Sequence, residues 1–281
     1  MRWQGRRKSS NVEDRRGMGG RGLTVGGGLG AVVALVIYLF FGGKTDKIPQ
    51  GINPLQQSKT STERVLTAQE KELGDFAAVV LADTEDVWNS ILSKAGHEYR
   101  EPRMILFSGA TESACGFAQS ATGPFYCPGD EKVYIDLDFF QELQRRLNAP
   151  GDFAMAYVIA HEVGHHVQNL LGIMDQVNRM RERLSKREFN SYSVKLELQA
   201  DFLAGVWAHH AQRMKNMLEE GDIEEAINAT GAVGDDRIQK KTQGYVVPDS
   251  FTHGTSKQRT YWFLKGWKTG DLSQGNTFDT E

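Results

Sequence analysis

Residues 160–170 read AHEVGHHVQNL, and this stretch decides the fold. Within it, His161, Glu162 and His165 form the pattern H-E-x-x-H. Residues four apart lie on one face of an α-helix, so the two imidazoles converge on one point while Glu162 borders the same space. Two nitrogen ligands with a carboxylate beside them are the arrangement of a catalytic zinc site. His166 falls well round the helix from His161, and we interpret it as a packing residue or as one that supports a ligand.

The helix that carries this pattern is strongly apolar. Phe153 and the run YVIA at 157–160 precede His161, which predicts a helix that is buried on most sides. Burying two imidazoles and a carboxylate costs free energy unless a partner binds them. A metal ion would be that partner.

A catalytic zinc ion takes three protein ligands, so the sequence must supply a third. The long motif H-E-x-x-H-x-x-G-x-x-H is excluded, because Gln168 stands in place of its glycine and Leu171 in place of its last histidine. The other solution is a glutamate from a separate helix, within E-x-x-x-D, and Glu197 and Asp201 fit it. The two share a helix face, so Glu197 can reach the metal while Asp201 reaches the outer nitrogen of a ligand histidine. Taken alone, such a carboxylate pair is usually structural.

Four segments resemble the neutral zinc metallopeptidase family of bacterial membrane-anchored proteins: HEVGHHVQ, ELQADFLAGVWAHH, PDSFTHGTSKQR and PFYCPGDEKVYID. The resemblance covers most of the chain, as far as about Gly266. More distantly, the chain is similar to the glutamate-zincin proteases, in which a His…Arg segment follows E-x-x-x-D. His253 and Arg259 match that segment, although Gly254 stands where those relatives have proline. The resemblance implies a zincin-like fold, a Zn²⁺ cofactor and peptidase activity, and it implies no particular substrate class.

The predicted site has a role for each of these residues. His161, His165 and Glu197 are the predicted metal ligands, and Glu162 is predicted to take a proton from water and to deliver it to the leaving amine. His253, or else a tyrosine nearby, is predicted to hydrogen-bond the developing oxyanion. Two alternatives stay open: His253 is a surface loop residue, and Arg259 pairs with Asp249 instead of supporting the site.

Charge and hydropathy divide the chain before residue 67. Residues 1–22 carry seven Lys and Arg against two acidic residues, which predicts a disordered cytoplasmic arm. Residues 23–42 include 19 consecutive uncharged positions, enough to cross a bilayer as an uncleaved helix, and a cleaved signal peptide is the alternative. Residues 43–66 are predicted to be a linker. The positive-inside rule then predicts a single-pass protein of the bacterial inner membrane, with the domain at 67–281 in the periplasm or outside the cell.

The predicted domain is α+β and mainly helical, with a small β-sheet. Helices are expected at 67–95, 136–148 and 192–217, and strands at 103–108 and within 124–136. The strand Val133 to Asp136 is predicted to be the sheet edge that holds an extended peptide substrate. A charged segment at 174–188 is expected to be helical, and so is a short acidic segment at 222–229.

Cys115 and Cys127 bracket a short loop, and in an oxidising compartment they can form a disulfide. Two buried free thiols are the alternative. Their spacing does not fit a zinc knuckle. A net charge of -3 excludes the strongly basic surface expected of a nucleic-acid-binding protein.

Three functions are compatible with these features. The first is a membrane-anchored zinc peptidase that acts on protein or peptide substrates. The second is a zinc-bound but proteolytically inactive domain that binds envelope proteins. The third is a structural anchor whose H-E-x-x-H pattern is accidental, and it requires two ligand motifs in the right order by chance. The sequence favours the first.

Overall fold

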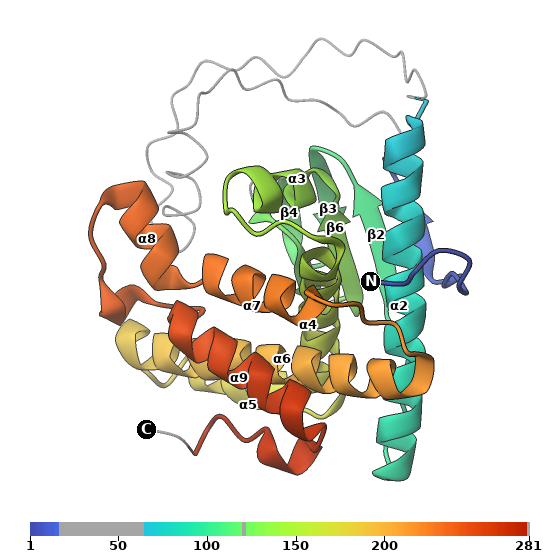
Figure 1. Ribbon diagram of the computed structural model, residues 1–281. Helices are drawn as coiled ribbons and strands as arrows, with labels where there is room; N and C mark the ends of the chain where they lie inside the picture. The colour runs from blue at the N-terminus through green and yellow to red at the C-terminus, as the bar shows by residue number, and fades with distance from the viewer. Residues whose placement is uncertain (17–64, 120–121, 280–281) are drawn as a thin grey trace.

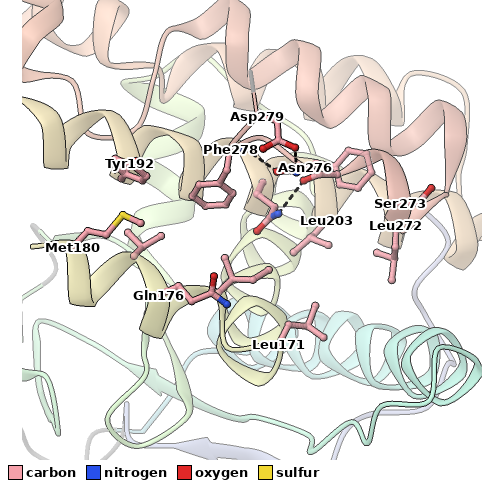
Figure 2. A pocket seen from close by; sticks show the side chains of 15 residues that line it. Leu171, Gln176, Met180, Tyr192, Leu203, Leu272, Ser273, Asn276, Phe278 and Asp279 are labelled. Atoms are coloured by element: carbon pink, nitrogen blue, oxygen red, sulfur yellow. Dashed lines mark hydrogen bonds between the residues drawn. The ribbon is translucent and has the colours of Figure 1, made fainter. Parts of the chain in front are cut away.

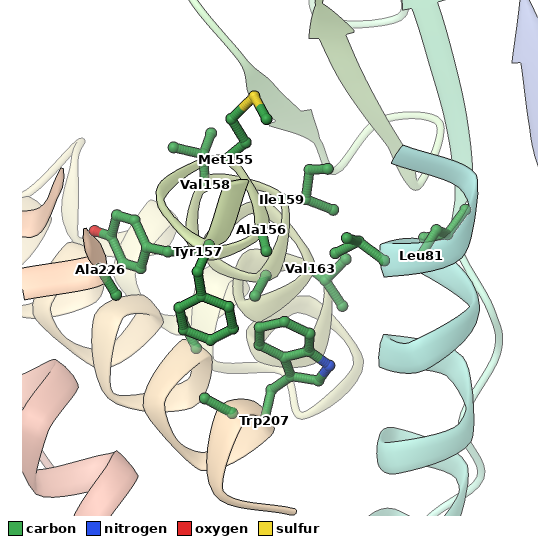
Figure 3. Packing of buried hydrophobic residues seen from close by; sticks show 14 of the residues in the cluster. Leu81, Met155, Ala156, Tyr157, Val158, Ile159, Val163, Trp207 and Ala226 are labelled. Carbon is green, nitrogen blue, oxygen red and sulfur yellow. The ribbon is translucent and has the colours of Figure 1, made fainter. Parts of the chain in front are cut away.

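Helix α4 (Asp152–Leu170), which carries the H-E-x-x-H pattern, runs through the centre of the protein (Figure 1). The computed structural model describes residues 1–16, 65–119 and 122–279. Every residue of α4 from Phe153 to Gln168 is buried. Helices α2 (Ala68–Lys94), α6 (Lys186–Lys215) and α7 (Asp222–Ala232) pack against it. Figure 3 shows Leu81 of α2 and Trp207 of α6 beside the apolar residues of α4. The predicted buried helix is confirmed.

A four-stranded sheet lies on one side of this helical body. Its strands follow the order β1 (Val12–Asp14), β2 (Arg103–Phe107), β6 (Lys132–Asp136) and β5 (Phe125–Cys127). The first three strands are parallel, and β5 runs antiparallel to β6. The expectation that residues 133–136 form the sheet edge is therefore wrong, because β6 lies between β2 and β5. Among the described strands, β5 is the edge on that side.

Helix α9 (Ser256–Thr269) lies along α6 at backbone contact distance. A Cβ atom at Gly205 would lie 2.1 Å from the carbonyl oxygen of Phe263, and one at Gly266 would lie 2.0 Å from that of Phe202. These glycines let the two backbones touch, which brings the N-terminal turn of α9 close to the Glu197 region of α6.

Capping boxes mark where three of the helices begin. Thr67 caps α2, Ser185 caps α6 and Thr255 caps α9, each through a glutamate or glutamine three residues later. Because of the Ser185 cap, α6 begins before the expected residue 192. Helix α5 is correspondingly shorter than the predicted segment 174–188. The remaining elements are β3 (Ala110–Ser113), β4 (Gly116–Gln119), α3 (Asp138–Arg145), α5 (Ile173–Met180), α8 (Asp235–Gln243) and the 3-10 turns η2 (Pro248–Ser250) and η3 (Leu272–Gln274).

The N-terminal residues differ most from their prediction. Residues 1–16 are ordered against the domain: β1 joins the sheet, and basic side chains of this segment bind acidic residues of α2. Arg6 binds the buried Asp83 at 2.6 Å, and Arg7 binds Asp86 at 2.7 Å. The charges that predicted a disordered arm are thus matched by α2.

The predicted fold class also needs a correction, because it placed one transmembrane helix in front of the domain. In the part of the chain that the structure describes, no helix combines the length and the apolar character needed to cross a bilayer. The predicted span at 23–42 lies outside the described residues, as does the predicted linker apart from residues 65 and 66. The described fold is mainly helical with small sheets.

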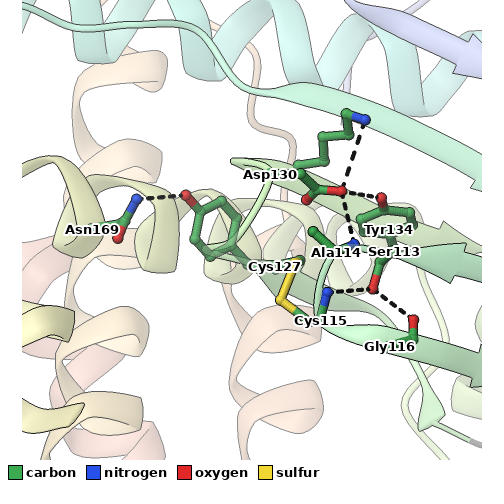
Figure 4. The surroundings of a disulfide bond; sticks show 10 residues. Ser113, Ala114, Cys115, Gly116, Cys127, Asp130, Tyr134 and Asn169 are labelled. Atoms are coloured by element: carbon green, nitrogen blue, oxygen red, sulfur yellow. Dashed lines mark hydrogen bonds and ion pairs between the residues drawn. A yellow bond between two sulfur atoms is a disulfide. The ribbon is translucent and has the colours of Figure 1, made fainter.

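A disulfide joins Cys115 to Cys127, with their Cα atoms 5.8 Å apart. Figure 4 shows that it ties the turn of the β3–β4 hairpin to the end of β5. In the turn between β5 and β6, Asp130 accepts hydrogen bonds from the hydroxyl of Tyr134 and from the backbone N–H of Ala114 in the hairpin turn. The edge strand β5 is therefore held by a covalent bond as well as by the sheet.

Candidate metal centre

Helices α4 and α6 bring together the three residues predicted as metal ligands. One nitrogen each of His161 and His165 and one carboxylate oxygen of Glu197 lie within 4.8 Å of one another. His161 Nε2 is 3.1 Å from Glu197 Oε2, and His165 Nε2 is 3.4 Å from Glu197 Oε1. The two helices approach closely at Gly164, where a Cβ atom would lie 3.0 Å from the carbonyl oxygen of Ala200. The small residue inside the H-E-x-x-H pattern thus lets α6 deliver its glutamate.

This donor set fits zinc. Two imidazole nitrogens and a carboxylate oxygen are a zinc ligand set that leaves a fourth position open. Ligands about 2.1 Å from a tetrahedral ion are about 3.4 Å from one another, which is close to the separations seen here. Both imidazoles and the carboxylate are largely shielded from solvent, as expected for groups that share a cation.

His161 is oriented by a buried ion pair. Its Nδ1 lies 2.9 Å from Asp201 Oδ1, so the ring presents Nε2 to the ligand cluster. Arg259 donates to both oxygens of Asp201, and the hydroxyl of Tyr157 donates to Oδ1 as well. Arg259 therefore lies where it can support the site. Asp249, the other pairing partner considered for Arg259, pairs instead with Arg187.

Charge in this cluster is strongly coupled. Burial alone would raise the pKa of Asp201, but Arg259 and then His161 hold it below its ordinary value. Burial would lower the pKa of His161, yet the Asp201 carboxylate and the bonds to Asp201 and Glu197 outweigh it and raise that pKa to about 10. Burial likewise opposes the charge on Glu197, but the neighbouring imidazoles keep its pKa well below the ordinary value.

Glu162 occupies a different environment from the ligands. Its side chain is buried, and burial raises its pKa above the ordinary value, while the adjacent imidazoles act in the opposite direction. A carboxylate with a raised pKa is a better proton acceptor than an exposed one. Glu162 lines the same cleft as the three candidate ligands.

His253 reaches this cleft from the loop before α9, and Asp235 holds it there. Asp235 Oδ1 lies 3.1 Å from His253 Nδ1, while Oδ2 accepts backbone N–H groups from Thr252, His253 and Gly254 at 2.8, 2.7 and 3.0 Å. A proline at 254 could not donate the third of these bonds. Gly254 also has a φ of +94°, which proline cannot adopt. The departure from the His-Pro pattern of the distant relatives thus has a structural reason.

The cleft has a volume of about 420 Å³ and is bounded by three parts of the fold. Helices α4 and α6 provide its polar floor. Residues 122–126, which lead into and form part of β5, provide one wall, and Val233, Ile238 and His253 lie opposite. The cleft also has apolar lining side chains, namely Phe125, Phe139, Val158, Met174 and Leu196.

Sequence reasoning missed three residues that structure this site. Asp235 is remote from every motif, and Tyr157 was counted only as an apolar helix residue. Gln168 was noted only because it is not glycine, yet it contacts His165 Nδ1 at 2.8 Å. For Tyr157 and Gln168 a signal did exist, since each lies about one helical turn from a ligand histidine. His166 does not join the cluster, since its ring bonds the hydroxyl of Tyr126 and the carbonyl of Arg100, as expected of a packing residue.

Comparison with known proteins covers almost the whole chain. Residues 1–278 match the family model described as "Putative neutral zinc metallopeptidase". The "Uncharacterized protein YpfJ" of Escherichia coli K12 is 48% identical over 287 aligned residues, which span 99% of each chain. The "Uncharacterized protein Mb2605" of Mycobacterium bovis is 43% identical over 202 residues, which are 68% of this chain and 66% of that protein. No solved structure matches the chain. With the family's two motifs converging on one cluster and the match running from its first residue to residue 278, this chain belongs to the neutral zinc metallopeptidase family.

Proposed function

We propose that this protein is a zinc-dependent peptidase whose metal is held by His161, His165 and Glu197. One observation carries the proposal: three ligand atoms converge within 4.8 Å of one another on the floor of a cleft that Glu162 also lines. A structural zinc site would be closed by four protein ligands. In the described residues this group contains three, which leaves room for water and substrate.

Each protein group then has a chemical task. A zinc ion bound here supplies Lewis-acid polarisation of a carbonyl and a lowered pKa for water. Glu162 takes the proton of the attacking water and delivers it to the leaving amine. His253, held by Asp235, donates a hydrogen bond to the oxyanion, which is worth roughly 3 kcal/mol for a single donor. Burial opposes a charge on His253, but the bond to Asp235 and the Glu197 carboxylate raise its pKa, which favours the donating form.

The cleft favours an extended peptide as substrate. The edge strand β5 (Phe125–Cys127) and the residues before it form one wall, so a peptide can pair with this edge while its side chains contact the apolar lining. The disulfide at Cys127 stiffens the edge before substrate arrives. This strand replaces β6 as the proposed pairing edge.

The disulfide also supports a proposal about location. Disulfides persist in oxidising compartments and are rare in the cytosol. We therefore place the working domain outside the cytoplasm, in the periplasm or beyond it.

The test measures zinc and turnover in the same samples. Elemental analysis of the wild type should find one zinc per chain, and Glu197→Ala and His161→Ala should lose it or bind it far more weakly. Fluorogenic peptides with apolar side chains around the cleaved bond should be hydrolysed by the wild type. Glu162→Gln should keep its zinc and lose turnover, whereas the exposed Glu220→Gln, as the matched control, should retain both.

Two results would count against this function. Zinc retained in Glu197→Ala would refute the ligand assignment. Zinc bound by the wild type without hydrolysis of any peptide or protein would instead favour the inactive binding domain.

A further inference from the structure

A buried chain of hydrogen bonds connects the candidate ligand His165 to the C-terminal segment 272–279. His165 Nδ1 lies 2.8 Å from Gln168 Oε1. Gln168 Nε2 donates to Gln199 Oε1 at 3.0 Å, and Gln199 Nε2 donates to the carbonyl oxygen of Gly275 at 2.9 Å. Both glutamines are buried, and Gln168 has no exposed surface.

Two backbone carbonyls determine the direction in which each of these hydrogen bonds is donated. Gln168 Nε2 also donates to the carbonyl of Leu196 at 2.7 Å, and a carbonyl can only accept. Turning the Gln168 amide over would place its oxygen against that carbonyl and against Gln199 Oε1. Gln199 cannot turn over either, because its NH₂ group serves the carbonyl of Gly275. The amide oxygen of Gln199 therefore faces Gln168, and the amide oxygen of Gln168 faces His165.

The consequence for His165 is a defined tautomer. An amide oxygen at Nδ1 accepts a hydrogen bond, so Nδ1 carries a proton and Nε2 is the nitrogen that faces Glu197 and is free to bind a metal ion. His161 obtains the same orientation from the carboxylate of Asp201. One ligand histidine is thus supported by a charged partner and the other by a neutral amide.

At its other end this chain of hydrogen bonds reaches residues 272–279, which form a C-terminal strap bound to α6. Thr277 Oγ1 donates to the carbonyl of Lys195 at 2.6 Å, and Lys195 Nζ donates to the carbonyl of Phe278 at 3.0 Å. Gly275 packs against the Phe202 ring so closely that a Cβ atom at this position would lie 2.5 Å from Phe202 Cε1. The strap and Gln199 both line a pocket of about 590 Å³. Figure 2 shows Leu272, Asn276 and Phe278 of the strap at this pocket.

We propose that Gln168 and Gln199 are positioning residues that hold His165 in the metal-binding tautomer, and that the C-terminal strap sets their orientation through Gly275. This inference rests on the zinc site proposed above. It assigns a role in the metal centre to residues of the last ten positions of the chain, which no motif connects to it.

The test uses the full chain and reads zinc affinity and tautomer separately. Gln168→Met and Gln199→Met keep the side-chain length and remove the amide. Gly275→Ala disturbs the strap without touching either glutamine. Competition with a chromophoric chelator gives the zinc dissociation constant, and ring ¹⁵N spectra of ¹⁵N-histidine-labelled, metal-free protein give the tautomer, with the His165 signals identified by their loss in His165→Gln.

The expected result is ordered along the chain. Gln168→Met should weaken zinc binding about 10- to 100-fold, in line with other groups that support a ligand histidine, and the signal of a protonated, hydrogen-bonded Nδ1 in His165 should weaken. Gln199→Met and Gly275→Ala should change both readouts in the same direction by smaller factors. Thr230→Val is the control, because it removes a partly buried hydrogen bond between α7 and α9 that is separate from the two glutamines.

Unchanged zinc affinity and an unchanged His165 tautomer in both glutamine variants would overturn the proposal. So would an equal loss of affinity in Thr230→Val, because general destabilisation would then explain the effect. Should the wild type bind no zinc, the proposed function fails, while the tautomer in metal-free protein still decides whether the glutamines orient His165. If Gln168→Met does not fold, zinc affinity and the His165 tautomer in Gly275→Ala decide the proposal.

Discussion

Arg259 on α9 donates one hydrogen bond to each carboxylate oxygen of Asp201 on α6, at 2.8 and 2.9 Å. Both side chains are buried, and the same carboxylate orients His161. A buried charge is tolerated only where it is paired and hydrogen-bonded. The contact between α6 and α9 is therefore coupled directly to the geometry of the candidate metal centre.

Removing Arg259 should destabilise the protein strongly. Arg259→Met leaves the Asp201 carboxylate buried without its cation, and breaking a buried pair in this way costs about 3–5 kcal/mol. Urea unfolding of the metal-free protein measures the change. The double variant Arg259→Met with Asp201→Asn should recover part of the loss, since no unpaired charge remains. If the single variant lost under about 1 kcal/mol, the pair would be behaving like an exposed one.

The pairing of Asp235 with His253 should give stability a characteristic pH dependence. The pKa of His253 is raised above 6.5, so its contribution is complete below pH 6.5 and is lost as pH rises through the folded value. The pKa of Asp235 is lowered below 3.8, because His253 and backbone N–H groups outweigh burial. Its contribution is therefore complete above pH 3.8 and is lost as pH falls through the folded value.

The variant Asp235→Asn tests this window. Its loss of unfolding free energy relative to wild type should be largest between pH 3.8 and 6.5 and should shrink at higher pH. In NMR titrations of the variant, the His253 pKa should fall toward 6.5. A stability difference independent of pH, with the His253 pKa unchanged, would contradict the assigned ion pair.

Gly205 should not tolerate even a methyl group. In Gly205→Ala the new Cβ atom would meet the Phe263 carbonyl at 2.1 Å, so α6 and α9 must separate. Overpacking of this kind typically costs 1–3 kcal/mol, or roughly 2–12 °C in a domain of about 200 residues. Thermal unfolding measures it. Gly231→Ala is the matched control on helix α7, where the nearest atom is the end of the Arg237 side chain at 3.4 Å, and its melting temperature should be unchanged or higher. Equal effects of the two substitutions would refute the close contact of α6 and α9.

Reducing the disulfide should loosen the β5 edge and leave metal binding intact. The bond closes a loop between residues 12 apart, for which loop entropy gives about 3 kcal/mol. The free energy of unfolding of the variant Cys115→Ser with Cys127→Ser, measured with urea, should be lower by that amount. Amide exchange in β5 should be faster. Zinc affinity should not change, because neither cysteine contacts the ligand cluster. Loss of zinc on reduction would instead make the disulfide part of the metal site.

The sequence by itself determined the local chemistry of this protein. The spacings of His161 with His165 and of Glu197 with Asp201 each place two groups on one face of a helix, and helical periodicity is a property of the chain alone. Apolar runs likewise predicted α2, α4 and strands β2, β5 and β6, and these elements are present. The family follows from the same motifs.

Only the tertiary structure decided how these pieces support one another. Asp235 and His253 are 18 residues apart in the sequence, and Gly275 and Gln199 are 76 apart. Neither pairing produces a periodic pattern in the sequence. The strand order that makes β5 the edge depends on which strands pair. The prediction that the N-terminal basic residues are disordered was wrong for a related reason. Their ion pairs with acidic residues of α2 form only in the folded protein. Long-range pairing depends on the assembled core, which local sequence does not encode.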